Sequence, residues 1–255
     1  MNGQMRRTIP FPRLMAGLWL ALLAVPLAGP AGAQSVLRPL DRPAGGSPVV
    51  VELFTSQGCA SCPPADAILH DLAGLEGVLP LALHVDYWDY IGWRDTFGSP
   101  LFTARQQAYA RAAGERMIYT PQMIIGGRDR VLGSDPVAVM AYVSAHAARP
   151  VPVALELERI EGGIHIAARS PLPFVRPVAV HLVHFLPEAR VEITLGENAG
   201  HVLDYVNIVT GWQTLGEWDG AAPLALDVLL TGEEPGAVIL QEPGPGAILA
   251  AGELP

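Results

Sequence analysis

The chain has 255 residues and a formal net charge of −9 at pH 7, and all 16 of its Lys and Arg positions are arginine. An acidic protein is a poor ligand for nucleic acid or for an anionic membrane surface, so we exclude both as partners. With two cysteines, the chain can neither form a disulfide framework nor supply four cysteines to a zinc site.

The N-terminal segment is typical of a secretory signal peptide at residues 1–33. Three arginines precede the apolar run "LMAGLWLALLAVPLAG", and "AGA" offers a small-residue cleavage site after Ala33. Removing these three arginines, with no acids among them, takes the net charge from −9 to −12. We expect a periplasmic or secreted protein without a stable membrane span after cleavage. An uncleaved anchor is the alternative, although the run is short for a span.

The next segments predict a β-α-β unit. After a lead-in at residues 34–47, "SPVVVELFTS" has the β-branched and aromatic composition of a buried central strand. In "CPPADAILHDLAGL", apolar residues recur at helical spacing, and Pro63 and Pro64 mark the helix start because proline is tolerated in a first turn. "LPLALHVDYW" is predicted to be a second buried strand, joined to the first by a right-handed crossover.

A helix, a hairpin and a final helix complete the first half. "GSPLFTARQQAYARAAGERM" predicts a helix that begins at Ser99-Pro100, and "TPQMIIGGRDRVLG" predicts a hairpin that turns at Gly126-Gly127. "SDPVAVMAYVSAHAA" predicts a helix capped by Ser134 or Asp135. We therefore expect an α/β domain at residues 48–149.

The pattern of predicted elements changes near Arg149, where we place a domain boundary. Beyond it, helical periodicity disappears and short alternating runs such as "VPVALELERI", "PVAVHLVHFL" and "LDYVNIVTGW" are separated by Gly/Pro turns. This pattern predicts an all-β, antiparallel sandwich-like domain at residues 150–255. The segment "GENAGHVLDY" suits either a functional loop or an ordinary hairpin turn.

Cys59 and Cys62 form a C-x-x-C motif at the predicted start of a helix. Unpaired N–H groups and the partial positive charge of a helix N-terminus favour the thiolate, which is the form that reacts in thiol exchange. We assign Cys59 as the more exposed, nucleophilic thiol, because it lies just before the helix. Ala60 and Ser61 are small and leave it open to a protein substrate. Cys62, one turn further along, is placed to attack a mixed disulfide and release the partner.

These residues resemble two known groups of proteins. A C-x-x-C motif at a strand-to-helix turn, with Thr120-Pro121 before a hairpin, is similar to the thioredoxin-like superfamily over about residues 48–149. A helical insertion before Tyr119 departs from the minimal fold of that superfamily. With "ELFTSQGCASCPPAD", "HVDYWDYIGW" and "YTPQM", the mature chain is similar to a bacterial secreted family named domain of unknown function 1223. The thioredoxin resemblance implies a cis bond at Pro121 facing the disulfide. It also implies a proton-relay role for Glu52, although thioredoxins carry Asp near this place.

Together these features predict an exported thiol–disulfide oxidoreductase with no cofactor and no bound metal. Its partners would be thiols or disulfides of proteins or small molecules, and a redox partner that the sequence does not identify. Catalysis is assigned to the four residues Cys59, Cys62, Pro121 and Glu52. Substrate binding is assigned to Thr120, Trp88 and Trp93, because aromatic residues near a reactive disulfide can hold an extended client.

Several alternatives stay open at this point. The disulfide could be an inert staple in a non-enzymatic envelope binding module whose β half holds the partner. The two thiols could hold Cu(I), with His84 or Met123 as a further ligand. Glu52 could reach solvent at the sheet edge or pair with an arginine such as Arg128. Trp88 and Trp93 could cover the inserted segment as a small separate core.

Overall fold

The computed structural model describes residues 46–255 apart from residues 231 and 233. The predicted signal peptide at residues 1–33 and almost all of the predicted lead-in lie outside the described residues. Within the described residues, no helix is long and apolar enough to cross a membrane.

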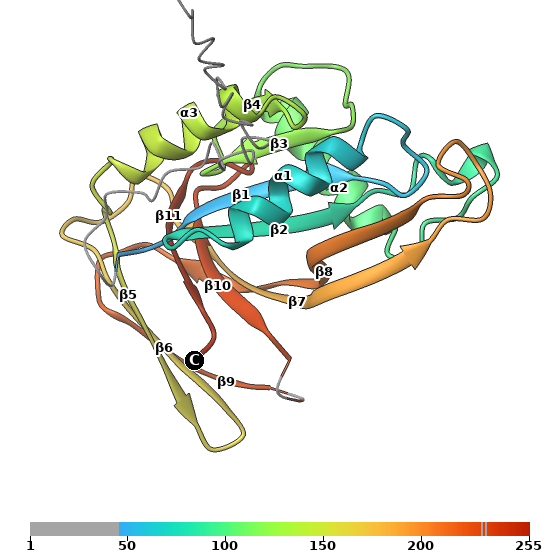
Figure 1. Cartoon of the computed structure of the whole chain (residues 1–255). Helices are drawn as coiled ribbons and strands as arrows, with labels where there is room; N and C mark the ends of the chain where they lie inside the picture. Colours follow the sequence, from blue (N-terminus) through green and yellow to red (C-terminus); the bar gives the residue numbers. More distant parts are fainter. Residues whose placement is uncertain (1–45, 231, 233) are drawn as a thin grey trace, which may run out of the picture. The chain divides into compact units, whose positions relative to one another are not determined.

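The elements of the first half follow the predicted order of strand, helix, strand, helix, hairpin and helix (Figure 1). They are β1 (Val49–Thr55), α1 (Pro63–Ala73), β2 (Val78–His84), α2 (Pro100–Ala112), β3 (Gln122–Ile125), β4 (Asp129–Leu132) and α3 (Pro136–Ala147), with a short 3-10 helix, η1 (Asp89–Ile91), in the segment between β2 and α2.

Local signals in the sequence set the ends of these elements. Pro63 opens α1, where its missing N–H is harmless. The Ser99 side chain accepts a hydrogen bond from the Leu101 N–H at the start of α2. At α3 the cap is Asp135, whose carboxylate accepts from the backbone of residues 137 and 138. The β3–β4 turn needs positive φ at two successive positions, and Gly126-Gly127 supplies it with +57° and +69°.

The second half consists of strands: β5 (Ala154–Ile160), β6 (Gly163–Arg169), β7 (Val178–Glu192), β8 (Val202–Trp218), β9 (Leu224–Leu229), β10 (Gly236–Gln241) and β11 (Ile248–Glu253). In the described part of the chain they contribute to an eight-stranded sheet of order β11-β10-β7-β8-β2-β1-β3-β4 and form a three-stranded sheet of order β5-β6-β9. Strands β1 and β2 are parallel, and β8 joins β2 in parallel through the pair Ala82 and Ile208. Residues on both sides of the predicted boundary near Arg149 therefore share one sheet, and the boundary itself stays a prediction.

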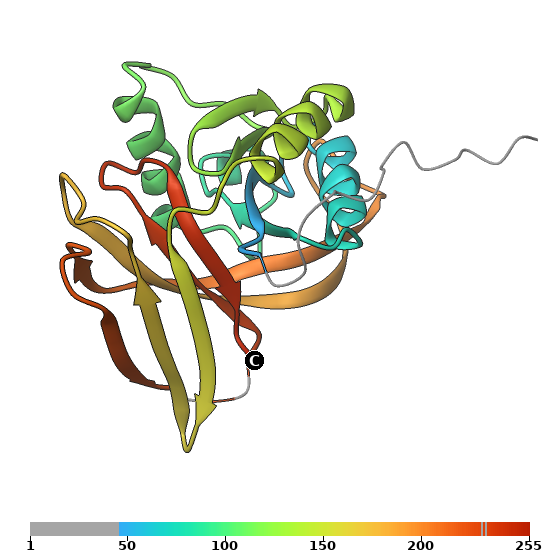
Figure 2. The same cartoon turned by 90° about the vertical axis from the view of Figure 1, so that its left-hand side faces the viewer.

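The buried side chains fall into three clusters. Successive residues of β1 point to opposite faces, so Val51 and Leu53 pack toward α1 and α3, while Val50 and Phe54 pack toward α2. The third cluster fills the space between the small sheet and the outer strands of the large one, with side chains such as Ile166 from one and those of β7 and β10 from the other. Figure 2 shows the small sheet alongside β10 and β11. The second half is thus sandwich-like at this end, but its large sheet is a mixed sheet shared with the first half.

Candidate active site

Cys59 and Cys62 are joined by a disulfide bond in the turn between β1 and α1. Cys62 is the N-cap residue of α1, and its backbone N–H donates to the Cys59 carbonyl at 3.1 Å. The Ala65 N–H in turn donates to the Cys62 carbonyl at 2.8 Å. The pair therefore lies at the positive end of a helix dipole, as the sequence predicts, where a thiolate is favoured after reduction.

Both cysteines are fully buried, with 0% of each residue exposed. The expectation that Cys59 is the more exposed thiol is therefore wrong for the disulfide form. Ala60 and Ser61 are exposed, but the segment between β2 and Tyr119, residues 85–118 and here called the insertion, covers the turn from another side. A Cβ atom on Gly58 would lie only 3.2 Å from the Cβ of Trp88. A side chain at this position would therefore need Trp88 to give way by a few tenths of an ångström.

Three of the predicted site residues are joined in one chain of hydrogen bonds. The Thr120 hydroxyl donates to the Cys59 sulfur at 3.2 Å, and the Trp88 indole N–H donates to the Thr120 oxygen at 2.8 Å. The peptide bond between Thr120 and Pro121 is cis, which confirms the prediction made for it. The structure thus brings together the motif, the residue before the proline and one aromatic residue of the insertion.

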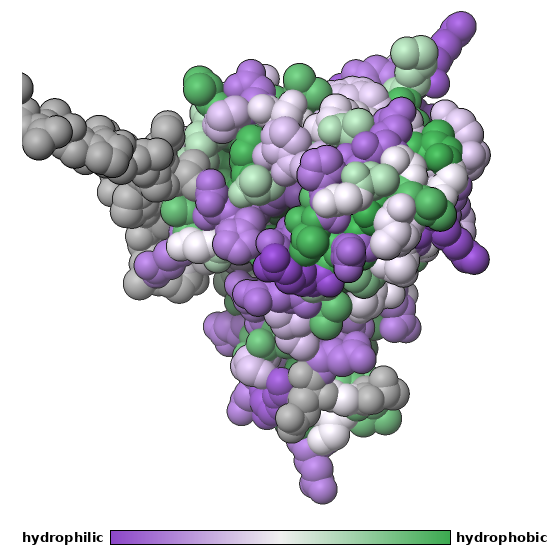
Figure 3. Space-filling view, turned by 45° about the vertical axis from the view of Figure 1, so that its right-hand side comes forward, coloured by the Kyte–Doolittle hydropathy of each residue, from purple (hydrophilic) through white to green (hydrophobic). Residues whose placement is uncertain are grey.

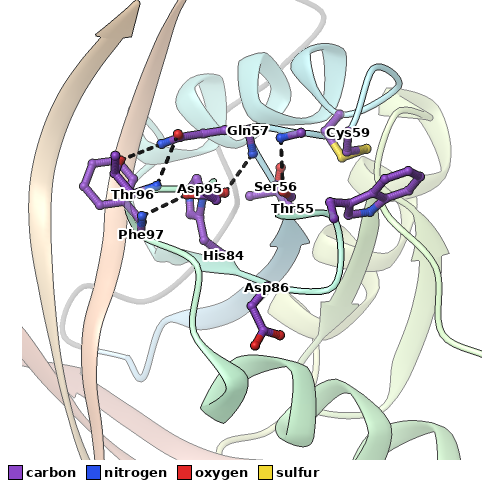
Figure 4. Close-up of polar contacts among 12 residues, drawn as sticks. Thr55, Ser56, Gln57, Cys59, His84, Asp86, Asp95, Thr96 and Phe97 are labelled. Atoms are coloured by element: carbon purple, nitrogen blue, oxygen red, sulfur yellow. Dashed lines mark hydrogen bonds and ion pairs between the residues drawn. A yellow bond between two sulfur atoms is a disulfide. The ribbon is translucent and has the colours of Figure 1, made fainter. Parts of the chain in front are cut away.

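Trp93 contacts the turn through a hydrogen bond to Gln57, not to a cysteine. Its indole N–H donates to the Gln57 side-chain oxygen at 2.8 Å, and the Gln57 amide group donates to the Thr96 hydroxyl at 2.9 Å. The backbone N–H of Gln57 donates to an Asp95 carboxylate oxygen at 2.8 Å. Figure 4 shows Gln57 between the disulfide and these residues of the insertion. The insertion therefore positions the residues that precede Cys59.

A buried polar cluster lies behind the turn (Figure 4). The His84 Nδ1 atom is 2.8 Å from an Asp95 oxygen, and both side chains are fully buried. The Thr55 hydroxyl donates to Asp66 Oδ1 at 2.8 Å, whereas Asp66 Oδ2 has no hydrogen-bond partner among the described residues. Burial raises the pKa of Asp66 from 3.8 to about 7, although the nearby His84 acts in the opposite direction. Burial also disfavours ionised Asp95, but His84 and two backbone N–H donors outweigh this and hold the pKa of Asp95 below its ordinary value.

Sequence reasoning missed Asp66 as a site residue, although a signal for it exists. Asp66 follows Cys62 by four positions, which places the two on one face of a helix, and it sits between the core positions Ala65 and Leu69. An acid beside core positions of a helix, one turn after a reactive cysteine, marks a candidate proton carrier. No comparable sequence pattern predicts the contact between His84 and Asp95, because the two residues lie in different segments.

Glu52 is buried on the other face of the sheet, where its partners come from α2. Arg105 Nε donates to Glu52 Oε1 at 2.6 Å, and the Tyr109 hydroxyl donates to the second oxygen. Arg105 is thus the partner, and Arg128 instead lies 3.6 Å from Glu242. The side-chain hydrogen bonds and the ion pair of Glu52 are made with residues of α2, whereas the cysteines lie at the start of α1, which packs on the opposite face of the sheet. These contacts do not support the relay role assigned to Glu52.

The copper alternative gains no support from the side chains around the disulfide. Over residues 46–255, leaving out 231 and 233, no group of three or more His, Cys, Asp or Glu side chains is arranged to hold a metal ion. His84 has its Nδ1 atom engaged with Asp95, and Met123 is fully buried in the core.

The sequence matches the family described as "Protein of unknown function (DUF1223)" over residues 50–241. The chain belongs to this family. A search of curated proteins gives no match. The family membership confirms the resemblance seen in the motifs, and it carries no activity with it.

Two solved structures are similar to this chain. Protein AGR_C_4864 from Agrobacterium tumefaciens shares 34% sequence identity, with a TM-score of 0.72 over 82% of this chain and 94% of that one. HBP35 of Porphyromonas gingivalis shares 14% identity, with a TM-score of 0.53 over 82% of this chain and 74% of that one. The second likeness, at 14% identity, concerns the fold alone.

Proposed function

We propose that this protein is an exported thiol–disulfide oxidoreductase that exchanges the Cys59–Cys62 disulfide with thiols and disulfides of client proteins. One observation carries the proposal: the pair lies at the N-terminus of α1, and the Thr120 hydroxyl, next to the cis-proline, donates to the Cys59 sulfur. This arrangement stabilises negative charge on that sulfur in two ways, by a helix dipole and by a hydrogen bond.

The exchange balances in both directions. In the reducing direction, the Cys59 thiolate attacks a client disulfide, forming a mixed disulfide and releasing one client thiolate. The Cys62 thiolate then attacks the Cys59 sulfur, which closes the Cys59–Cys62 bond and releases the second client thiolate. The client gains two electrons and the pair loses two. The oxidising direction is the reverse, and the reduction potential of the pair sets which one prevails.

Asp66 is our candidate for the group that takes the proton from Cys62. Its backbone N–H donates to the Cys62 carbonyl at 3.1 Å, and its position one turn later places it on the same helix face. With a pKa raised to about 7 by burial, the side chain exchanges a proton near neutral pH. This role replaces the one that the resemblance assigned to Glu52.

A protein client suits the surroundings of the pair better than a small thiol. Tyr119, which precedes Thr120, is exposed, and Tyr90 and Met117 expose about four-fifths of their surfaces, 82% and 79%. Trp88 and Trp93 are half-buried and join this group from the insertion. On the face shown in Figure 3, apolar residues occur in small groups between polar ones, which suits a transient partner more than a permanent one.

Alkylation and redox titration test the proposal. With dithiothreitol-reduced protein, we expect Cys59 to react faster with iodoacetamide than Cys62. Cys59→Ser should abolish exchange with a disulfide-bonded peptide, and Cys62→Ser should trap the mixed disulfide. The reduction potential should lie above roughly −300 mV. Equal, slow alkylation of both thiols together with a lower potential would refute the proposal.

The complete burial of both cysteines favours a second candidate, a structural disulfide in a non-enzymatic binding module. For such a staple, the potential falls below roughly −300 mV. The same titration therefore separates the two functions. A serine substitution at either cysteine would then lower the melting temperature, and the wild-type protein itself would show no exchange with a disulfide-bonded peptide.

A further inference from the structure

The loop between β7 and β8, residues 193–201, reaches the active-site turn from the second half of the chain. Its own backbone is tied together: the Ile193 N–H donates to the His201 carbonyl at 2.9 Å, and the Gly200 N–H donates to the Ile193 carbonyl at 2.8 Å. The His201 N–H also donates to the Asn198 carbonyl at 3.1 Å. Asn198 is therefore presented by a closed loop, with only 4% of its surface exposed.

The side-chain amide of Asn198 binds the two carbonyls on either side of Gly58. Its Nδ2 atom donates to the Gln57 carbonyl at 2.9 Å and to the Cys59 carbonyl at 3.0 Å. An amide nitrogen has two hydrogens, so both donors are used. The contacts bridge residues 139 and 141 positions apart in the chain, and they fall on the segment that carries the first cysteine.

We propose that Asn198 is a positioning residue that holds Cys59 within reach of Cys62 when the disulfide is open. In the disulfide form, the S–S bond itself keeps the two cysteines together. After reduction, the Cys59 segment is held by the Asn198 amide and by local bonds such as that from the Cys62 N–H to the Cys59 carbonyl. Two thiols held in this way have a high effective concentration for each other, which favours closure of the ring.

Removing the Asn198 amide should affect the reduced form more than the disulfide form. Without the amide, the oxidised form loses little order, because the disulfide still constrains the turn, whereas the reduced form gains freedom. Disulfide formation becomes less favourable and the pair becomes easier to reduce. Two hydrogen bonds of ordinary net strength correspond to about a tenfold lower equilibrium constant for closure. For a two-electron couple this is a rise of about 30 mV.

The inference rests on the proposed function for its meaning, but its measurement does not require a client. Wild-type protein, Asn198→Ala and Asn198→Ser are equilibrated with dithiothreitol at graded ratios of its reduced and oxidised forms, and the closed fraction is read by thiol labelling. Glu197→Gln, at an exposed neighbour in the same loop, is the matched control. We expect an about tenfold shift for Asn198→Ala, a smaller one for Asn198→Ser, which keeps one donor, and none for the control.

Asn198→Ala could lower the melting temperature equally in both redox forms and leave the equilibrium constant for disulfide closure unchanged. That result would mean that Asn198 is merely structural and would overturn the inference. Amide exchange in the wild type gives a second readout that survives if the variants do not fold. The side-chain amide protons of Asn198 should stay protected in the reduced protein, and rapid exchange on reduction would also overturn it. A wild type that fails to exchange with client disulfides refutes the proposed function alone, because the closure equilibrium is still measured.

Discussion

Two buried carboxylates lie on opposite faces of the central sheet, and they differ in how completely they are partnered. Glu52 has a guanidinium on one oxygen and a phenol on the other, so its charge is compensated within the core. Asp66 has a single hydroxyl donor and an oxygen without a partner among the described residues. Burial thus accompanies two different arrangements: a carboxylate whose ion pair and hydrogen bonds hold elements together, and an acid that can gain or lose a proton near neutral pH.

The largest expected effect is the loss of stability when Glu52 is replaced. Glu52→Ala leaves the Arg105 guanidinium buried without its counter-charge, which should lower the free energy of unfolding by about 3–5 kcal/mol. Urea denaturation measures this value. Arg128→Ala, at an exposed pair with Glu242, is the control and should change stability by about 0–1 kcal/mol. A loss of similar size in the two variants would show that the Glu52 pair is solvated.

Titration of the Asp66 carboxyl group should instead govern how the free energy of unfolding depends on pH. Because folding raises the pKa of Asp66, the folded chain binds this proton more tightly than the unfolded chain. The resulting stability is fully present below about pH 4 and is lost as the pH rises to about 7, a span worth up to roughly 4 kcal/mol. Asp66→Asn should remove this fall. The comparison is made by urea denaturation at several pH values, with Asp71→Asn, an exposed acid of the same helix, as the control.

The rate at which a mixed disulfide is released should also depend on Asp66 and not on Glu52. Asp66→Asn should slow release of a mixed disulfide by about 100-fold, because Cys62 loses its proton acceptor. Glu52→Gln should leave the pH dependence of that step unchanged, even if the variant is less stable. Stopped-flow measurement on a mixed disulfide at Cys59 gives both rates. The reverse pattern would restore the relay role to Glu52.

The smallest expected effect concerns Thr55, which donates the hydrogen bond to Asp66. Thr55→Val removes a donor that favours the ionised carboxylate, so the pKa of Asp66 should rise further, with a stability loss of about 1 kcal/mol. The midpoint of the stability fall should then move to higher pH. A midpoint that stays in place would place the proton on a different group.

The course of the first half was predictable because its signals are local. Prolines, glycines and a capping acid act on residues next to them, and they mark the ends of α1, the β3–β4 turn and α3 correctly. The cis bond at Thr120-Pro121 came from the family resemblance, since local chemistry gives no such preference. The predicted exposure of Cys59 was wrong because burial depends on residues from separate segments, such as Thr120, whose hydroxyl lies 3.2 Å from the Cys59 sulfur.

What the sequence did not predict are contacts between segments far apart in the chain. The pairing of β8 with β2 passes through Ala82 and Ile208, and neither residue carries a mark of its partner. Asn198 lies in a Gly-rich stretch that suits an ordinary turn equally well, so its contact with Cys59 becomes visible only when the β7–β8 loop is placed. The sequence of that loop therefore fits a functional loop and an ordinary hairpin turn equally well, and only its contacts distinguish the two.

The position of Asn198 in the chain also imposes an order in time. A polypeptide is synthesised from its N-terminus, so Cys59 and Cys62 emerge well before the residue that binds their turn. During this interval the two thiols lack the contacts of the β7–β8 loop and of the β8 strand, and other thiols and disulfides can reach them more easily. The last part of the chain then closes over the pair. Maturation of this site is thus a sequence of events, in which the disulfide can form first and its surroundings are completed afterwards.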